Sequence, residues 1–432
     1  HVRSRRQRQM CIRDRHQSAP FKQIQTTHFI PALEIEISKT LEEIDHICSN
    51  PATPTFENTL EALEQSGEQL GIISGILFNL NSAETTNELQ EVTQKAAPLL
   101  TKFQNDVRLN KVLFDRIKNI FDKKETLALD PEQLTLIEKE YKGFVRNGAL
   151  LSVEDKDKLR LIDTELAKLS LSFGEHVLAD TQAFELHLTD KKQLSGLPQT
   201  SITQAEALAK EKNKDGWVFT LDYPSYVPFV TFADDRALRK KMSLAFGKRG
   251  FQKNENNNES IILKLVQLKK DRANLLGYSS HADFVLEERM AQSASQVNQF
   301  LDDLYQNALP YAKKEWEQIE RFAEDQLDLK DLQKWDTPYV SEKLKQELFD
   351  FDEQILKPYF PLPNVLKGLF EIVERLYGLR FEQSDAIQGY HKDVICYEVF
   401  NETGGFHALL YADFHPRSGK RSGAWMTSYR SQ

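Results

Sequence analysis

The chain has 432 residues, 40% of them hydrophobic, which is enough for two packed lobes or for one elongated body with a sizeable core. Its 56 basic and 65 acidic residues give a formal charge of −9, and six of the arginines lie in the first fifteen residues. The rest of the chain is acidic, which argues against nucleic acid as a partner. No apolar run approaches the ~20 residues that cross a bilayer, which argues against a membrane protein.

The first segment, HVRSRRQRQMCIRDR, has neither the apolar region of a signal peptide nor a helical or strand period. We interpret residues 1–16 as non-native or disordered, the alternative being a natural basic arm. The abrupt stop at Ser431-Gln432 leads us to expect a clipped gene.

Residues 27–124 predict consecutive helices, the second of which is capped by Thr55 and runs through Leu77. Another strong helix is expected after Ser152, whose hydroxyl faces Asp155 in the capping position. Its apolar residues alternate by three and four, a pattern that requires a partner helix alongside; they are Leu159, Ile162, Leu166, Leu169 and Phe173.

Between residues 181 and 226 the pattern predicts two short strands, one near 184–188 and one from Trp217 to Pro224, on either side of a helix at Gln204–Glu211. Helices resume at Asp234 and continue to about Gln326, with breaks near 254–258 and at Gly277.

The longest of these helices carries an apolar stripe, and we expect Pro310 to kink it; the stripe is Val297, Leu301, Leu304, Ala308 and Tyr311. Two further helices follow residues 335–338, the second being Pro363–Tyr377, and then a hairpin of Val394–Phe400 and His407–Phe414. The predicted fold class is therefore mainly α, an elongated multi-helix body with a few short strands.

A search for catalytic patterns finds none in this chain. No histidine is followed by Glu and no two histidines lie within one helical turn, so the H-E-x-x-H zinc motif is absent. The G-x-S-x-G and P-loop patterns are absent as well. Cys396 lies inside a predicted strand, where a small buried residue is the ordinary interpretation. We therefore expect no catalytic residue and no metal ligand before Gln432.

One segment is a candidate for substrate binding, the Gly-rich basic loop that follows Tyr411. Arg417, Lys420 and Arg421 offer charged donors for a peptide carboxylate. The alternative, that these cations pair with the protein's own carboxylates, has the stronger support from the sequence alone. The three cysteines are far apart and form no C-x-x-C pair, which favours a reducing compartment such as the cytoplasm.

Several separated blocks resemble the thimet-oligopeptidase-like zinc peptidases. They occur in the expected order across about residues 20–432: Asn50–Thr59, Leu275–Tyr278, Ala282–Phe284, Glu288–Ala291, Tyr359–Leu362, Gly368–Phe370 and Arg375–Gly378. Within the family, Gly143–Ala149 and Tyr411–Arg417 resemble the peptidyl-dipeptidase branch, whereas Pro224–Tyr226 resembles oligopeptidase A.

The resemblance implies a helical, zincin-like peptidase split by a deep channel, with zinc on the channel floor. It implies that residues 17–232 form an amino-terminal helical region, and that 233–432 form the first part of a peptidase domain that stops before the zinc motif. The complete protein would be a zinc metallopeptidase cleaving short peptides, which we expect to release carboxyl-terminal dipeptides, while this chain alone would be inactive. The alternative is a non-enzymatic helical scaffold or peptide-binding protein.

Overall fold

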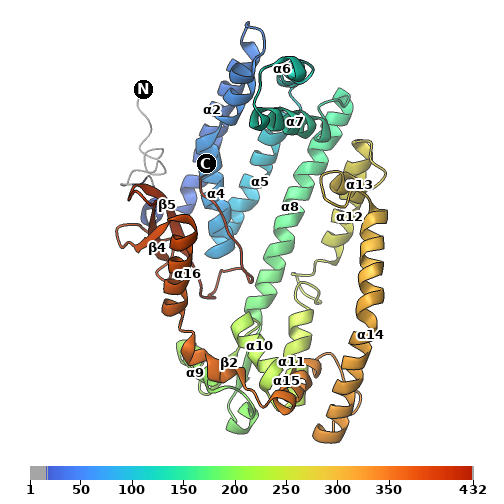
Figure 1. Cartoon of the computed structure of the whole chain (residues 1–432), viewed down its shortest axis with the longest axis vertical. Coiled ribbons are helices and arrows are strands. Elements are labelled where there is room, and N and C mark those ends of the chain that lie inside the picture. Colours follow the sequence, from blue (N-terminus) through green and yellow to red (C-terminus); the bar gives the residue numbers. More distant parts are fainter. Residues whose placement is uncertain (1–15, 17, 431–432) are drawn as a thin grey trace.

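The computed structural model describes His16 and residues 18–430, and it is an elongated body built mainly of helices (Figure 1). Helix α8 (Val153–Ala183) runs along the centre of the body and packs against α5 (Asn87–Arg108) and α12 (Glu259–Leu275). Helix α14 (Ala294–Leu327) forms one edge, and α16 (Leu362–Tyr377) lies on the other with a small sheet. The predicted fold class is confirmed.

The amino-terminal part contains helices that follow one another closely, as predicted. In chain order they are η1 (Phe21–Gln23), η2 (Thr26–His28), α2 (Phe29–Ser49), the π-helical turn η3 (Phe56–Glu61), α3 (Ala62–Glu64), α4 (Glu68–Ala83), α5, α6 (Lys111–Phe121), η4 (Lys124–Thr126) and α7 (Pro131–Arg146). The predicted cap at Thr55 is confirmed, because its hydroxyl accepts a hydrogen bond from the backbone N–H of Asn58 at 3.2 Å.

The helix predicted from Thr55 through Leu77 is interrupted, so its predicted length is wrong. Gly67 has a φ of 72°, a left-handed conformation that favours glycine and ends the first helical stretch. Its N–H donates to Glu43 in α2 at 3.0 Å. A Cβ at this position would lie 2.9 Å from Thr40, so the turn also lets the backbone approach α2 closely.

Polar side chains make hydrogen bonds near both ends of helix α8. Ser152 caps it by accepting a hydrogen bond from the N–H of Asp155 at 3.2 Å, as predicted. Near its end, the buried Asp180 accepts hydrogen bonds from the Gly250 N–H at 2.7 Å and from the Asn254 and Asn256 amides at 2.9 Å. These bonds hold the predicted break after α11 (Arg236–Gly247) against α8.

The two predicted strands are confirmed as β1 (Leu186–Leu188) and β2 (Trp217–Phe219), an antiparallel pair with Leu186 opposite Phe219. Between them lie η5 (Lys191–Leu194) and α9 (Gln199–Glu211). The sequence did not predict α10 (Tyr223–Phe232). Pro224 was expected to end a strand, yet it lies in the first turn of this helix, where a missing N–H costs no hydrogen bond.

A buried carboxylate joins the start of α15 (Thr337–Phe349) to α11. Asp336 is 0% exposed, and Arg239 and Arg236 donate to it at 3.0 and 2.7 Å. A buried pair of this kind costs about 3–5 kcal/mol when one partner is removed, because the other charge is left in an apolar environment. The contact therefore fixes the junction between α14 and α15 on α11.

The carboxyl-terminal part contains α13 (His281–Leu286), α14, α15, η6 (Glu353–Tyr359) and α16, followed by a sheet of order β3-β4-β5. The predicted hairpin is confirmed as β4 (Ile395–Phe400) and β5 (Phe406–Ala412), with Cys396 buried in β4. Strand β3 (Arg380–Gln383) was not predicted, because its largely exposed residues show no apolar alternation.

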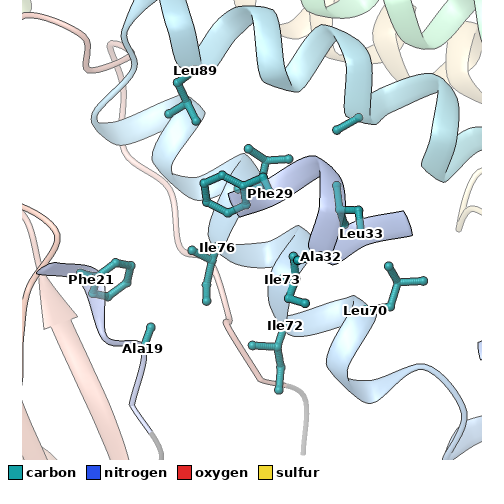
Figure 2. Close-up of a cluster of buried hydrophobic side chains, with 12 residues drawn as sticks. Ala19, Phe21, Phe29, Ala32, Leu33, Leu70, Ile72, Ile73, Ile76 and Leu89 are labelled. Atoms are coloured by element: carbon teal, nitrogen blue, oxygen red, sulfur yellow. The ribbon is translucent and has the colours of Figure 1, made fainter. Parts of the chain in front are cut away.

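The core is divided among clusters along the body. Figure 2 shows the first, in which Phe29 and Leu33 of α2 face Ile73 and Ile76 of α4, with Phe21 beside them. A second cluster is built around α6 and α7, and a third around β1, β2 and α10. Each buries leucine and phenylalanine side chains, the usual content of a packed interior.

The apolar stripe of α14 is not part of these clusters. Leu301 and Leu304 are 51% and 55% exposed, and Tyr311 is exposed too, so the sequence pattern correctly predicts the helix but not its burial. Pro310 lies inside α14 without ending it. Within the described residues, no helix combines the length and the apolar character needed to cross a bilayer.

We predict that replacing Leu301 and Leu304 together by glutamine leaves the free energy of unfolding within about 0.5 kcal/mol of the parent, because exposed positions contribute little. The same change should reduce the fluorescence of a dye that binds apolar surfaces. Denaturant titration and dye binding measure the two effects.

The matched control is Leu33→Ala, a fully buried position in α2 that should cost about 2–5 kcal/mol. A loss of more than about 2 kcal/mol in the α14 variant would contradict its exposure in the folded chain.

Candidate functional site

A cavity of about 1400 Å³ lies between α4, α16, β5 and the start of α10. Strand β5 and the segment after it supply a nearly continuous part of the wall, and α16 adds apolar side chains such as Leu369 and Phe370. The volume exceeds the roughly 300–1,000 Å³ that is common for small-molecule sites, so the cavity has room for an extended ligand.

The segment after β5 is fixed by one buried carboxylate, Asp413. Arg417 donates to both of its oxygens, at 2.8 and 2.9 Å, and Lys420 lies 2.9 Å from one of them. The hydroxyl of Tyr390 also donates to Asp413 at 2.9 Å. Arg417 further donates to the carbonyl of Ala83 at 2.6 Å and pairs with Glu84, both at the end of α4.

This arrangement stabilises the ionised form of Asp413. Burial alone would raise the pKa of the carboxyl group, but the hydrogen bonds from Arg417, Lys420 and Tyr390 outweigh burial and lower the pKa to about 2. The pKa of Tyr390 is raised by burial and by its hydrogen bond to Asp413, so its hydroxyl stays protonated. The group is a structural ion-pair network at neutral pH.

Backbone contacts dock the same segment on α4. The N–H of Thr85 donates to the carbonyl of Gly419 at 2.8 Å, and the N–H of Arg421 donates to the carbonyl of Ser82 at 2.8 Å. Gly419 has a φ of 78°, and a Cβ there would lie 2.4 Å from the carbonyl oxygen of Thr85. Only glycine permits this approach.

The three predicted substrate-binding residues therefore occupy different environments. Arg417 and Lys420 are bound to protein carboxylates and carbonyls, which is the alternative that the sequence favoured for the loop. Arg421 is exposed, and its guanidinium carbon lies 4.9 Å from the centre of the Trp425 ring. Among the described residues no carboxylate pairs with Arg421, which lines the cavity.

Sequence reasoning missed Asp413, Tyr390 and Glu84. The spacing of Asp413 and Arg417 by four positions is a detectable signal for an ion pair. Glu84 lies 333 positions from Arg417, so no local pattern connects them.

The described part of the chain, His16 and residues 18–430, contains no group of three or more His, Cys, Asp or Glu side chains that would hold a metal ion. The H-E-x-x-H pattern is also absent from the whole sequence. These residues do not fit a zinc centre, and we derive no chemical step through one. Burial raises the pKa of the Cys396 thiol to about 11, so this side chain is not a thiolate nucleophile at neutral pH.

Comparison with known proteins places the chain in a family. A model described as "Peptidase family M3" matches residues 229–432, and a model of the "Neurolysin/Thimet oligopeptidase, N-terminal domain" matches residues 30–158. The chain belongs to peptidase family M3. The sequence resemblance to the thimet-oligopeptidase-like peptidases is thereby confirmed.

Among the relatives of this M3 chain, the dipeptidyl carboxypeptidase of Escherichia coli is 34% identical over 414 residues, which are 95% of the chain and 61% of the relative. Oligopeptidase A of the same organism is 31% identical, over 94% of the chain and 60% of the relative. Saccharolysin of Saccharomyces cerevisiae is 26% identical, over 86% and 54%. The M3 chain thus spans about 60% of the length of its bacterial relatives.

The M3 match begins at residue 229, inside α10, whereas we predicted a boundary between residues 232 and 233. That boundary remains a prediction. The prediction for residues 1–16 lies, apart from His16, outside the described residues.

We predict that the Asp413 network makes stability depend on pH in a defined window. The pKa of Asp413 is lower in the folded chain than its ordinary 3.8, so its contribution is complete above about pH 4 and is lost as the pH falls towards 2. The contribution corresponds to about 2 kcal/mol. Thermal unfolding of the parent and of Asp413→Asn between pH 2 and 7 measures it, and the variant should show a flatter profile.

At pH 7 the same substitution should cost about 3 kcal/mol, since Arg417 and Lys420 then lack their buried counter-charge. Limited proteolysis should show residues 416–430 released from α4. Asp393→Asn is the control, because Asp393 is more exposed and its one ion pair within the described residues is with His391, at 3.5 Å. Equal effects of the two substitutions would refute the role of Asp413.

Proposed function

We propose that this chain forms the helical wall and the sheet of a zinc metallopeptidase that acts on short peptides. The two family models, which together match most of the chain, carry the proposal. The cavity between α4, α16 and β5 supports it, because its size suits an extended peptide and its wall offers one exposed guanidinium, Arg421.

We further propose that the activity is the release of dipeptides from the carboxyl ends of peptides. The relative named dipeptidyl carboxypeptidase is 34% identical to the chain and oligopeptidase A is 31% identical. The blocks Gly143–Ala149 and Tyr411–Arg417 also resemble the peptidyl-dipeptidase branch. The difference in identity is small, so the nature of the products distinguishes the two branches.

Zinc belongs to the complete protein in this proposal, and its ligands are expected outside the 432 residues, since these contain no H-E-x-x-H pattern. The widely spaced cysteines suit a reducing compartment, for which we propose the cytoplasm. The negative net charge of the chain argues against nucleic acid as a partner. The alternative of a non-enzymatic scaffold or peptide-binding protein is not favoured by the named relatives, which are peptidases.

The proposal predicts that the gene continues in frame beyond codon 432 and encodes H-E-x-x-H. The product of that longer frame should release carboxyl-terminal dipeptides from amino-blocked pentapeptides, and a zinc chelator should abolish the release. Mass spectrometry of the products measures both.

The 432-residue chain serves as the matched control and should release nothing. Cleavage together with one bound zinc per 432-residue chain would refute the expected location of the ligands. Cleavage at internal bonds would instead assign the protein to the oligopeptidase A branch. A longer frame without the motif, and without cleavage, would favour the scaffold alternative.

A further inference from the structure

The three basic side chains of the loop after β5 have two different roles. Arg417 and Lys420 contact Asp413 and the carbonyls of Ala83 and His415, and their side chains are only 11% and 10% exposed. Because these charges are already compensated and largely removed from solvent, they are not available to a ligand. Their contacts hold the loop in one position on α4.

Arg421 follows Lys420 directly, but its side chain is exposed and is not held by a protein carboxylate among the described residues. Its backbone is fixed by the hydrogen bond to Ser82, whereas its side chain is exposed at the cavity wall. The ring of Trp425 lies 4.9 Å from the guanidinium carbon and braces it from one side. An arginine stacked on an aromatic ring keeps its planar donors free for a carboxylate.

The other charged side chains at the cavity wall are in different situations. Asp222 is a carboxylate that accepts a hydrogen bond from the Thr220 hydroxyl at 2.9 Å. Arg430 also lines the cavity, but it pairs with Glu68 at 2.9 Å. Asp413 lines the cavity and is neutralised by its own cations. The chain as a whole has a formal charge of −9. The exposed guanidinium of Arg421, which pairs with no carboxylate among the described residues, is therefore a local positive charge that attracts an anionic group of a ligand.

We infer that Arg421, braced by Trp425, binds a carboxylate of a peptide in the cavity, and that this carboxylate is the peptide's carboxyl terminus. Arg417 and Lys420 act as positioning residues that fix the loop and do not touch the peptide. The inference rests on the proposed function, because it requires that the cavity receives peptides. A Glu or Asp side chain offers the same chemistry, so the experiment separates the two sources.

The experiment measures binding to the 432-residue chain and needs no cleavage. Three pentapeptides carry a fluorophore at the amino end: one with neutral side chains and a free carboxyl terminus, its carboxyl-terminal amide, and an amide with one internal Glu. Fluorescence anisotropy gives each Kd. We expect the free acid to bind at least about tenfold more tightly than either amide, as one charged hydrogen-bonded pair provides.

Arg421→Ala should bring the Kd of the free acid to that of its amide and leave the Kd of the amide unchanged. Arg421→Lys keeps the charge but loses the two-point geometry, so it should retain part of the preference. The matched control is Arg321→Ala, an exposed arginine of α14 away from the cavity, which should keep the full preference. Raising the ionic strength should weaken only the free acid.

Each other outcome overturns a different statement. If Arg421→Ala keeps the preference for the free acid, Arg421 does not bind the carboxylate, while the peptide cavity stands. If the amide with internal Glu binds as tightly as the free acid, the carboxyl terminus is not the recognised group. If none of the three peptides binds the parent chain, the proposed peptide cavity fails and the inference fails with it.

Discussion

The carboxylate of Asp413 joins parts of the chain that lie more than 300 positions apart. It binds Arg417 and Lys420 in its own loop, and Arg417 continues the network to Glu84 and the end of α4. Without Asp413, Lys420 would lose its carboxylate and Arg417 would keep only Glu84, and a largely buried cation without its counter-charge costs several kcal/mol. The position of the loop after β5 therefore depends on this ionised side chain together with the backbone hydrogen bonds of Gly419 and Arg421 to the end of α4.

A second buried carboxylate, Asp336, does the same at the opposite end of the body, where Arg236 and Arg239 join α11 to the start of α15. The Asp413 network holds the loop after β5 against α4 of the amino-terminal part, whereas the Asp336 network joins two helices that both lie within the M3 match. Ion pairs are directional, so they fix the relative position of two elements more narrowly than apolar contact does. Of the two networks, the one around Asp413 lies at the wall of the cavity between α4 and α16.

Elements whose signals are local were predictable from the sequence. Thr55 and Ser152 cap their helices through partners three positions away, and the alternation in α8 correctly required neighbouring helices. The misses have other causes. Gly67 turns where α2 approaches, and Pro224 lies in the first turn of α10 although a proline also suits the end of a strand. At the site, the sequence identified the basic loop but not which cation stays exposed, because Glu84 and Ser82 reach it only through the fold.

The exposure of helix α14 affects how the folded chain opens locally. It packs mainly on α13 and α15, near its two ends, and most of its length contacts solvent on all sides. A helix without tertiary support is held by its own hydrogen bonds and by side-chain pairs one turn apart, each worth a few tenths of a kcal/mol. Its middle turns are consequently expected to exchange amide protons through local opening, with α8 still folded, so cooperativity is lower along this edge than along the central helix.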